Sequence, residues 1–303
     1  MGQLPNFLIV GAAKSGTTSL YQYLRQHPEV FMPYLKEPTF LAGPETAGRI
    51  DTLDEYGELF SRVQREKAIG EASTIYLPDP RAPQKIMNLL GKDTKIIIVL
   101  RNPIDMIYSL WGHRRREGGE KSHFMEAVMK GKSRYKERNI ERIFSVAGRL
   151  AVRRPYPYVY QAQYADQVDR YKKVFEKVEV YIFEELFNDI IEGFNDLCSF
   201  LEVDDSFQPS FEKYNRAGEA RSKLLRSLIN NTYFIKQPLK VLLPSSVRIK
   251  IKSLVRYLNT QPNPLPPLSM HDRRQLAKVF EQDVNRLETL LDRSLSNIWT
   301  DFA

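Results

Sequence analysis

The sequence predicts a single α/β domain with a central parallel sheet flanked by helices. Short apolar strands alternate with amphipathic helices in the first third of the chain, as they do in βαβ units. Residues 95–100 (KIIIVL) form an unbroken apolar run, which is typical of a parallel strand buried on both faces. A loop of small residues, 11–16, follows the first expected strand, and this setting predicts a P-loop-like phosphate-binding loop.

The expected strands and helices follow one another without an obvious domain boundary. Strands are expected at 7–10, 68–70, 95–100 and 178–183. Helices are expected at 17–26, around 56–60, at 84–90, from 103 through 111, and at 164–175, 189–201 and 276–291. Residues 112–155 are very basic and low in apolar periodicity, so an exposed segment is expected there. Because the sequence has no internal repeat, residues 1–303 are predicted to form one domain.

The composition indicates an anionic partner and a reducing compartment. The net charge is +8, and the basic residues are spread along the chain, which disfavours nucleic-acid binding. The single cysteine, Cys198, excludes an intramolecular disulfide framework. No apolar run reaches the length of about 18 residues that spans a bilayer, and the chain does not begin like a signal peptide. We therefore expect a cytoplasmic protein.

The segment Gly11 to Thr18 (GAAKSGTT) lies between an expected strand and an expected helix. Backbone N–H groups at a helix N-terminus bind phosphate, and Lys14 adds a positive charge. The Walker A pattern of ATPases and GTPases requires lysine directly after the second glycine, where this chain has Thr17. An ordinary P-loop nucleotidase is therefore disfavoured.

This segment resembles the 5′-phosphosulfate loop of sulfotransferases that use PAPS (3′-phosphoadenosine-5′-phosphosulfate), particularly their carbohydrate-acting and bacterial branches. The resemblance implies that Lys14 contacts the oxygen between phosphorus and sulfur and stabilises the leaving phosphate. It also implies no requirement for a metal, and the sequence shows no metal-ligand cluster. The implied donor contacts of the loop are Lys14, Ser15, Gly16, Thr17 and Thr18.

The segment Arg101-Asn102-Pro103-x-Asp105-x-x-x-Ser109 directly follows the 95–100 strand and resembles the 3′-phosphate site of the same family. An arginine fork binds phosphate with two charge-assisted hydrogen bonds. The resemblance assigns the 3′-phosphate to Arg101 and Ser109. A later loop around Gly218 resembles the family segment that covers the nucleotide, which adds Arg221 and Ser222 as expected contacts.

Lys36-Glu37-Pro38-Thr39-Phe40 resembles the family's K-E-x-x-F segment. Its glutamate is the general base in glycan-modifying members, so the resemblance assigns proton removal from the acceptor to Glu37. Lys36 is expected to contact an anionic group of the donor or acceptor. His123 is an alternative base without comparable motif support.

Three weaker matches to the family predict the residues that contact the acceptor. Residues 70–76 (GEASTIY) resemble the family's E-x-[ST]-x-x-Y stretch beside the acceptor cleft, although glycan-acting relatives often carry lysine in place of Ala72. One turn past Ser109 lies a histidine, and residues 160–164 resemble a family helix start. The expected acceptor contacts are Glu71, Ser73, His113 and Gln163.

We therefore expect a PAPS-dependent sulfotransferase that moves a sulfuryl group to a hydroxyl or amine of a saccharide or small natural product and releases PAP. One alternative is a P-loop kinase, which requires a lysine after Gly16 and a Mg²⁺-binding carboxylate. Another is a non-catalytic module that binds membranes or nucleic acid. Residues 246–258, which form a basic amphipathic pattern, are the expected place for peripheral membrane contact.

Overall fold

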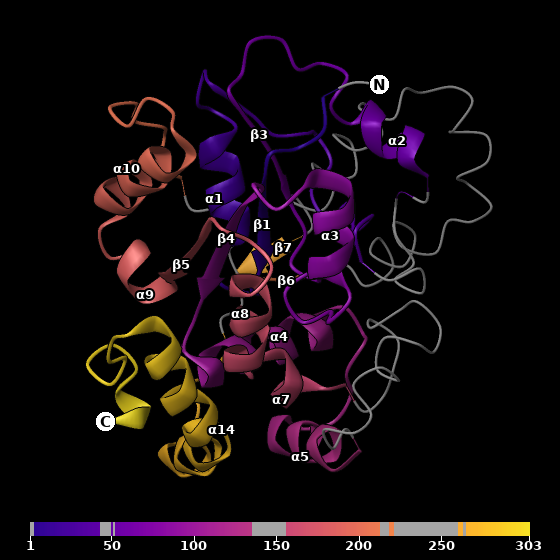
Figure 1. Ribbon diagram of the computed structural model, residues 1–303. Coiled ribbons are helices and arrows are strands. Elements are labelled where there is room, and N and C mark those ends of the chain that lie inside the picture. Colours follow the sequence, from indigo (N-terminus) through magenta and orange to yellow (C-terminus); the bar gives the residue numbers. More distant parts are fainter. Residues whose placement is uncertain are drawn as a thin grey trace, which may run out of the picture.

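Five parallel strands form one sheet in the order β2-β3-β1-β4-β5 in the computed structural model (Figure 1). The strands are β1 (Phe7–Gly11), β2 (Val30–Phe31), β3 (Ala68–Ala72), β4 (Lys95–Leu100) and β5 (Val178–Ile182). A separate antiparallel pair consists of β6 (Gly218–Ala220) and β7 (Thr260–Pro262). The structure describes residues 3–42, 50, 52–134, 156–212, 218–220, 260–262 and 265–303.

Helices cover both faces of the sheet. They are α1 (Thr17–Leu24), α2 (Leu53–Glu58), α3 (Ala82–Leu90), α4 (Pro103–Arg116), α5 (Phe124–Arg134), α7 (Tyr158–Gln161), α8 (Tyr164–Lys172), α9 (Phe183–Leu186), α10 (Ile190–Leu201) and α14 (Met270–Leu291), with a 3-10 turn η2 (Thr300–Phe302). Side chains of β4 alternate between two apolar cores. Ile96 and Ile98 face the core shared with α3, α4, α8 and α14, whereas Ile97 and Val99 face α1 and α10. The predicted α/β class is thus confirmed.

The direction in which the chain crosses the sheet reverses between β1 and β4. From β1 the chain continues through α1 to β2 on one side of the sheet, and from β4 it continues through α4 toward β5 on the other. Ligands of open α/β sheets bind where neighbouring strands diverge in this way, outside their carboxyl ends. Both predicted phosphate-binding segments follow these two strands.

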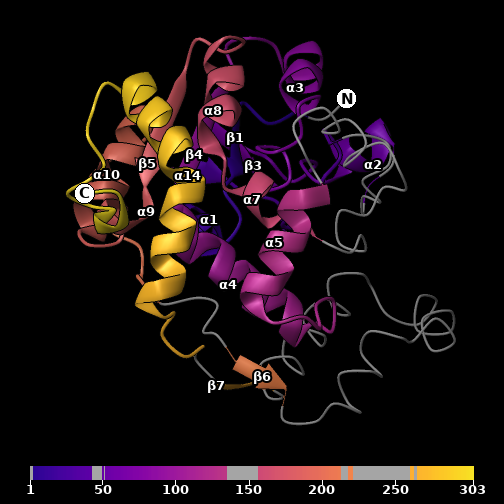
Figure 2. The ribbon, with the colours of Figure 1, turned by 90° about the horizontal axis from the view of Figure 1, so that it is seen from below.

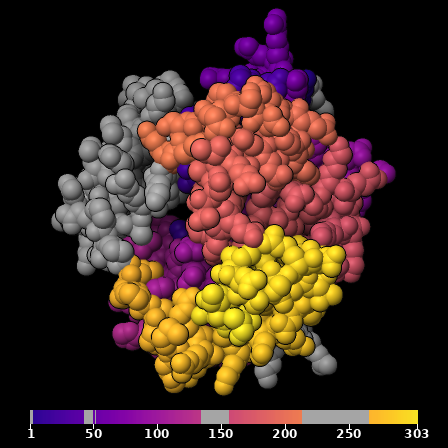
Figure 3. Space-filling model, turned by 90° about the vertical axis from the view of Figure 1, so that its left-hand side faces the viewer, coloured from indigo at the N-terminus to yellow at the C-terminus, as the bar shows by residue number. Residues whose placement is uncertain are grey.

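The C-terminal helix α14 packs beside α8 and α4 (Figure 2). It begins at Met270, earlier than its apolar spacing predicts, because the Ser269 hydroxyl accepts the N–H of Asp272 at 3.1 Å and caps the first turn. Arg293 bonds Glu185 and Trp299 bonds Glu184, so the residues after α14 pack against α9. In Figure 3 the yellow C-terminal end of the chain lies against the salmon-coloured segment. No helix within the described ranges is long and apolar enough to cross a membrane.

The expectation of an exposed segment over 112–155 was wrong for its first part. Helix α4 continues to Arg116, and α5 follows with Phe124, Ala127 and Val128 buried. These three residues have the i, i+3, i+4 spacing of a helix face, but the stripe is one turn long and surrounded by basic residues. Residues 135–155 lie outside the described ranges.

Candidate active site

The loop after β1 turns sharply into α1. Gly16, the residue that precedes α1, has a φ of +78°, a conformation that glycine adopts without steric cost. A Cβ atom at this position would lie 2.3 Å from the Phe187 ring, so a side chain has no room. Glycine also leaves the first-turn amides of α1 uncovered by a capping side chain. Uncapped amides at the positive end of a helix attract anions, as the loop sequence predicts for this position.

The loop after β1 and the residue after β4 are in direct contact. Arg101 donates from Nη1 to the carbonyl oxygen of Lys14 at 3.2 Å, although 87 residues separate them. The N–H of Ala12 also donates to the carbonyl of Val99 at 2.7 Å. The guanidinium carbon of Arg101 lies 4.9 Å from the centre of the Phe183 ring. The two predicted motifs therefore meet at one edge of the sheet.

Lys14 lies in a strongly electropositive environment. Its pKa is lowered to about 8, first by burial and then by the charges of Arg116, Arg101 and Lys36. The four cations come from different segments: the loop after β1, the end of α4, the end of β4 and the loop after β2. A bound polyanion would relieve their mutual repulsion. The site is therefore suited to a ligand with several negative charges.

Glu37 is held in a fixed position by the end of β3. Its φ is +60°, and its N–H donates to the carbonyl of Ala72 at 3.0 Å. The carboxylate accepts hydrogen bonds from Lys36 Nζ at 2.7 Å, from the N–H of Thr74 at 2.9 Å and from the Thr74 hydroxyl at 3.2 Å. The side chain remains 31% exposed, so an acceptor can still reach it.

The two predicted acceptor residues of the 70–76 stretch lie beneath this loop. Ser73 is fully buried, and its hydroxyl accepts the N–H of Thr39 at 3.1 Å. Glu71 is also fully buried and accepts hydrogen bonds from the hydroxyls of Tyr56 at 2.8 Å and Tyr76 at 3.0 Å. Neither side chain has exposed surface, so in this structure they support the loop and do not face an acceptor.

Helix α4 carries two more of the predicted site residues. Ser109 and His113 are both half-buried and lie one turn apart on the same face. Among the residues that the structure describes, no hydrogen bond joins Ser109 to Arg101. Arg116, seven residues after Ser109, continues this face toward Lys14. Arg116 was not among the predicted site residues, although its seven-residue spacing from Ser109 places both on one face of α4.

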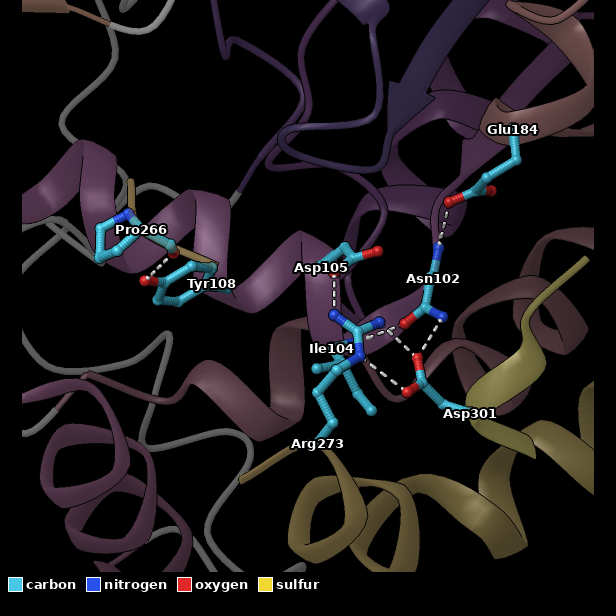
Figure 4. Close-up of polar contacts among 8 residues, drawn as sticks. All are labelled: Asn102, Ile104, Asp105, Tyr108, Glu184, Pro266, Arg273 and Asp301. Atoms are coloured by element: carbon cyan, nitrogen blue, oxygen red, sulfur yellow. Dashed lines mark hydrogen bonds and ion pairs between the residues drawn. The ribbon is translucent and has the colours of Figure 1, made fainter. Parts of the chain in front are cut away.

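The turn that follows Arg101 is fixed by the C-terminal segment. The Asn102 side chain accepts the N–H of Ile104 at 3.0 Å, which caps α4, and donates to Asp301 at 2.9 Å. Arg273 donates to Asp301 from Nε at 2.8 Å and to Asp105 from Nη1 at 2.8 Å. Figure 4 shows Asp301 between Asn102 and Arg273.

Glu184 fixes the same turn from the side of α9. It accepts the N–H of Asn102 at 3.0 Å through one oxygen and the indole N–H of Trp299 at 2.9 Å through the other. Tyr108 on α4 donates to the carbonyl of Pro266 at 2.8 Å, which links the helix to the segment before α14 (Figure 4). The start of α4 is therefore bonded to three distant parts of the chain.

Gln163 is the remaining predicted acceptor residue that the structure describes. It directly precedes α8 and is half-buried, next to Tyr164, whose pKa is raised by burial, an effect that the charge of Arg101 opposes. Arg221, Ser222 and the basic segment 246–258 lie outside the described residues. Within the described ranges, no group of three or more His, Cys, Asp or Glu residues could hold a metal ion.

A family model described as the sulfotransferase domain matches residues 4–234. The chain belongs to this sulfotransferase family. A solved sulfotransferase structure from Alicyclobacillus acidocaldarius is 30% identical, covers 98% of this chain and 99% of its own, and superposes with a TM-score of 0.70. Both predicted phosphate-binding segments of this sulfotransferase lie inside the matched range, whereas α14 and the residues after it lie outside.

Two curated relatives of this sulfotransferase match over shorter lengths. The membrane-associated sulfotransferase kil1 of Dictyostelium discoideum is 29% identical over 150 residues, which are 44% of this chain and 31% of the relative. The bifunctional heparan sulfate N-deacetylase/N-sulfotransferase 2 of Bos taurus is 34% identical over 121 residues, which are 38% of this chain and 14% of the relative. The match therefore spans less than a third of either curated relative.

Proposed function

We propose that this sulfotransferase moves a sulfuryl group from PAPS to an acceptor hydroxyl or amine and releases PAP. The observation that carries the proposal is the contact between Arg101 and Lys14, 3.2 Å from Nη1 to the carbonyl oxygen. This contact brings the guanidinium group of Arg101 and the loop that carries Lys14 to the same edge of the sheet. A nucleotide with phosphate groups at both its 3′ and 5′ positions needs two such anchors.

The donor contacts follow from this arrangement. The first-turn amides of α1, with Ser15, Gly16, Thr17 and Thr18, would bind the 5′-phosphosulfate. Arg101 and Ser109 would bind the 3′-phosphate, and Arg221 and Ser222 remain proposed contacts from the later loop. Arg116 joins this set because its charge acts on Lys14.

The reaction proposed here is an in-line substitution at sulfur. The acceptor oxygen or nitrogen forms a bond to sulfur as the bond from sulfur to the bridging oxygen breaks, and the electron pair stays on that oxygen of the 5′-phosphate. Lys14 would stabilise the charge that develops there. Glu37 would take the proton of the acceptor, and Lys36, bonded to Glu37 at 2.7 Å, would orient this carboxylate. No protein residue becomes covalently modified.

The proposed acceptor is a saccharide or a small natural product. The Glu37 side chain is 31% exposed, which supports an acceptor that arrives from solvent, and Lys36, His113 and Gln163 are the proposed contacts of that acceptor. The Bos taurus relative is named for N-sulfation of heparan sulfate, which supports a sugar amine among the candidates. We further propose that residues 1–303 act as one domain, and that the protein is cytoplasmic, since its single cysteine, Cys198, suits a reducing compartment.

Calorimetric titration with PAP, ADP and ATP in the absence of magnesium tests the donor. We expect PAP to bind much more tightly than ADP or ATP, because only PAP places phosphate on Arg101. A preference for ATP would contradict the proposal and favour a kinase. No nucleotide binding, together with co-sedimentation with anionic liposomes, would favour a membrane-binding module.

A further inference from the structure

We propose that Glu71 is a positioning residue for Glu37, and that its protonation state sets how strongly Glu37 attracts a proton. This inference rests on the proposed function, in which Glu37 is the general base. The two carboxyl groups belong to neighbouring segments, the end of β3 and the loop after β2. They differ in exposure, because the Glu37 side chain is 31% exposed whereas Glu71 is fully buried.

The surroundings of Glu71 favour retention of a proton. Its pKa is raised to about 7: burial raises it most and the negative charge of Glu37 adds to this, whereas hydrogen bonds from Ser73, Tyr56 and Tyr76 oppose the rise. One oxygen, Oε2, accepts both tyrosine hydroxyls. The other, Oε1, accepts no hydrogen bond of good geometry from the residues that the structure describes. A buried carboxylate oxygen without a donor is stabilised by protonation.

Glu71 is also connected to the loop that carries Glu37. The Tyr76 hydroxyl donates to Glu71 at 3.0 Å and accepts the N–H of Leu41 at 3.1 Å, so it bridges the carboxyl group to the end of the loop. Two residues of this loop, Glu37 and Thr39, have a φ of +60°. Residues other than glycine adopt this conformation only when their surroundings hold them. The 71–76 segment supplies those contacts.

The groups that face Glu71 are tyrosines, a serine and one acid. They come from α2 (Tyr56), from the segment after β3 (Ser73, Tyr76), from the loop after β2 (Glu37) and from α8 (Tyr171, whose pKa Glu71 helps to raise). The cation beside the pair is Lys36, which bonds Glu37 at 2.7 Å. Burial first, and then the charge of Glu37, raise the pKa of Glu71, so ionisation of Glu71 acts on Glu37 in return. As Glu71 loses its proton near neutral pH, Glu37 becomes a stronger proton acceptor.

Carbon-13 NMR titration of the side-chain carboxyl groups tests this coupling without any acceptor. The Glu71 signal is identified by its absence in Glu71→Gln. In the wild type we expect it to titrate near pH 7, and in Glu37→Gln we expect its midpoint to fall by about one pH unit, because the neighbouring charge is removed. An unchanged midpoint in Glu37→Gln would overturn the inference. Tyr56→Phe, which removes one hydrogen bond that favours the carboxylate, should move the midpoint upward.

The rate of sulfate release from PAPS then tests the functional consequence, with water as the acceptor and chitosan oligosaccharides as a second probe. We expect the wild-type rate to increase severalfold between pH 6 and 8 and the Glu71→Gln rate to stay nearly flat over that range. PAP affinity should be the same in both proteins, which shows that the variant is folded. Superimposable pH profiles would overturn the inference while leaving the proposed function intact. Absence of PAP binding by the wild type would instead contradict the proposed function.

Discussion

Asn102 donates a hydrogen bond from its side chain to Asp301 at 2.9 Å, although 199 residues separate them in the sequence. The same Asn102 caps α4 and directly follows Arg101, the proposed 3′-phosphate ligand. Asp301 is in turn held by Arg273 of α14. Residues beyond the matched range 4–234 therefore fix the turn on which the proposed donor site depends.

Asp301→Asn should weaken both the fold and donor binding. The variant keeps the size of the side chain but removes the charge that Arg273 and Asn102 contact, so we expect a loss of about 1–3 kcal/mol in the free energy of unfolding. PAP affinity should fall because Arg101 is less firmly placed. Urea denaturation and calorimetry measure the two effects. Asp169→Asn, which removes an exposed pair with Lys173, is the matched control and should behave like the wild type. If Asp301→Asn is destabilised but binds PAP as tightly as the wild type, the contact between Asp301 and Asn102 contributes to stability and not to donor binding.

Local patterns in the sequence predict the sheet, the loop after β1 and the position of Arg101 beside that loop. Each of these depends on residues close together in the chain, such as the apolar run 95–100 and the glycines around Lys14. Because parallel strands end at one edge of a sheet, the meeting of the two segments also follows from their positions after strands. The Arg101–Lys14 contact bears out this part of the reasoning.

Contacts between distant segments could not be predicted in the same way. No sequence pattern around Asp301 predicts its contact with Asn102. That contact depends on how α14 packs against α4. Glu71 was expected beside the acceptor because the 70–76 stretch resembles a family segment that borders the acceptor cleft. It is buried instead, since β3 lies between β2 and β1 and is covered on both faces. Thr74, which donates twice to Glu37, stands at an x position of the E-x-[ST]-x-x-Y motif, so the resemblance did not point to it.

Arg101→Ala should separate the two phosphate sites. Charge-assisted hydrogen bonds contribute about 1.5–3 kcal/mol, so PAP affinity should fall about 10- to 100-fold. Affinity for adenosine 5′-phosphate, which lacks the 3′-phosphate, should change little. Calorimetric titration of both ligands measures the difference, and Arg115→Ala, an exposed arginine of α4, serves as the control. Equal losses for the two ligands would refute the assignment of Arg101 to the 3′-phosphate.

Glu37→Gln should reduce turnover without loss of donor binding. An amide of the same shape cannot take a proton, so the rate should fall about 10²–10⁴-fold, the usual contribution of a general base. PAP affinity should stay within about twofold of the wild type, because the donor contacts come from other segments. Transfer of labelled sulfate from PAPS measures the rate, with Glu58→Gln at an exposed position as control. A wild-type rate in Glu37→Gln would exclude this residue as the base.

Lys14→Met should make the unliganded protein more stable while abolishing turnover. The pKa of Lys14 is about 8 in the folded state, below the value of 10.5 for an ordinary lysine, because burial and neighbouring cations disfavour its charge. The unfolded chain therefore binds more protons between these two values. The free energy of unfolding should therefore rise with pH in that window. Below pH 8 the folded protein carries the full destabilisation that the charged lysine causes.

Thermal unfolding at pH 7 and pH 10 measures this effect. We expect Lys14→Met to unfold at a higher temperature than the wild type at pH 7, and the difference to shrink at pH 10, where the wild-type lysine is largely neutral. Lys173→Met, at an exposed position, controls for the loss of one surface charge. PAP affinity of the wild type should decline as the pH rises through 8, since Lys14 then loses the charge that attracts the 5′-phosphate, and this decline should be absent in Lys14→Met. A variant less stable than the wild type at pH 7 would mean that the Lys14 ammonium stabilises the empty site, contrary to the electrostatics of the four clustered cations.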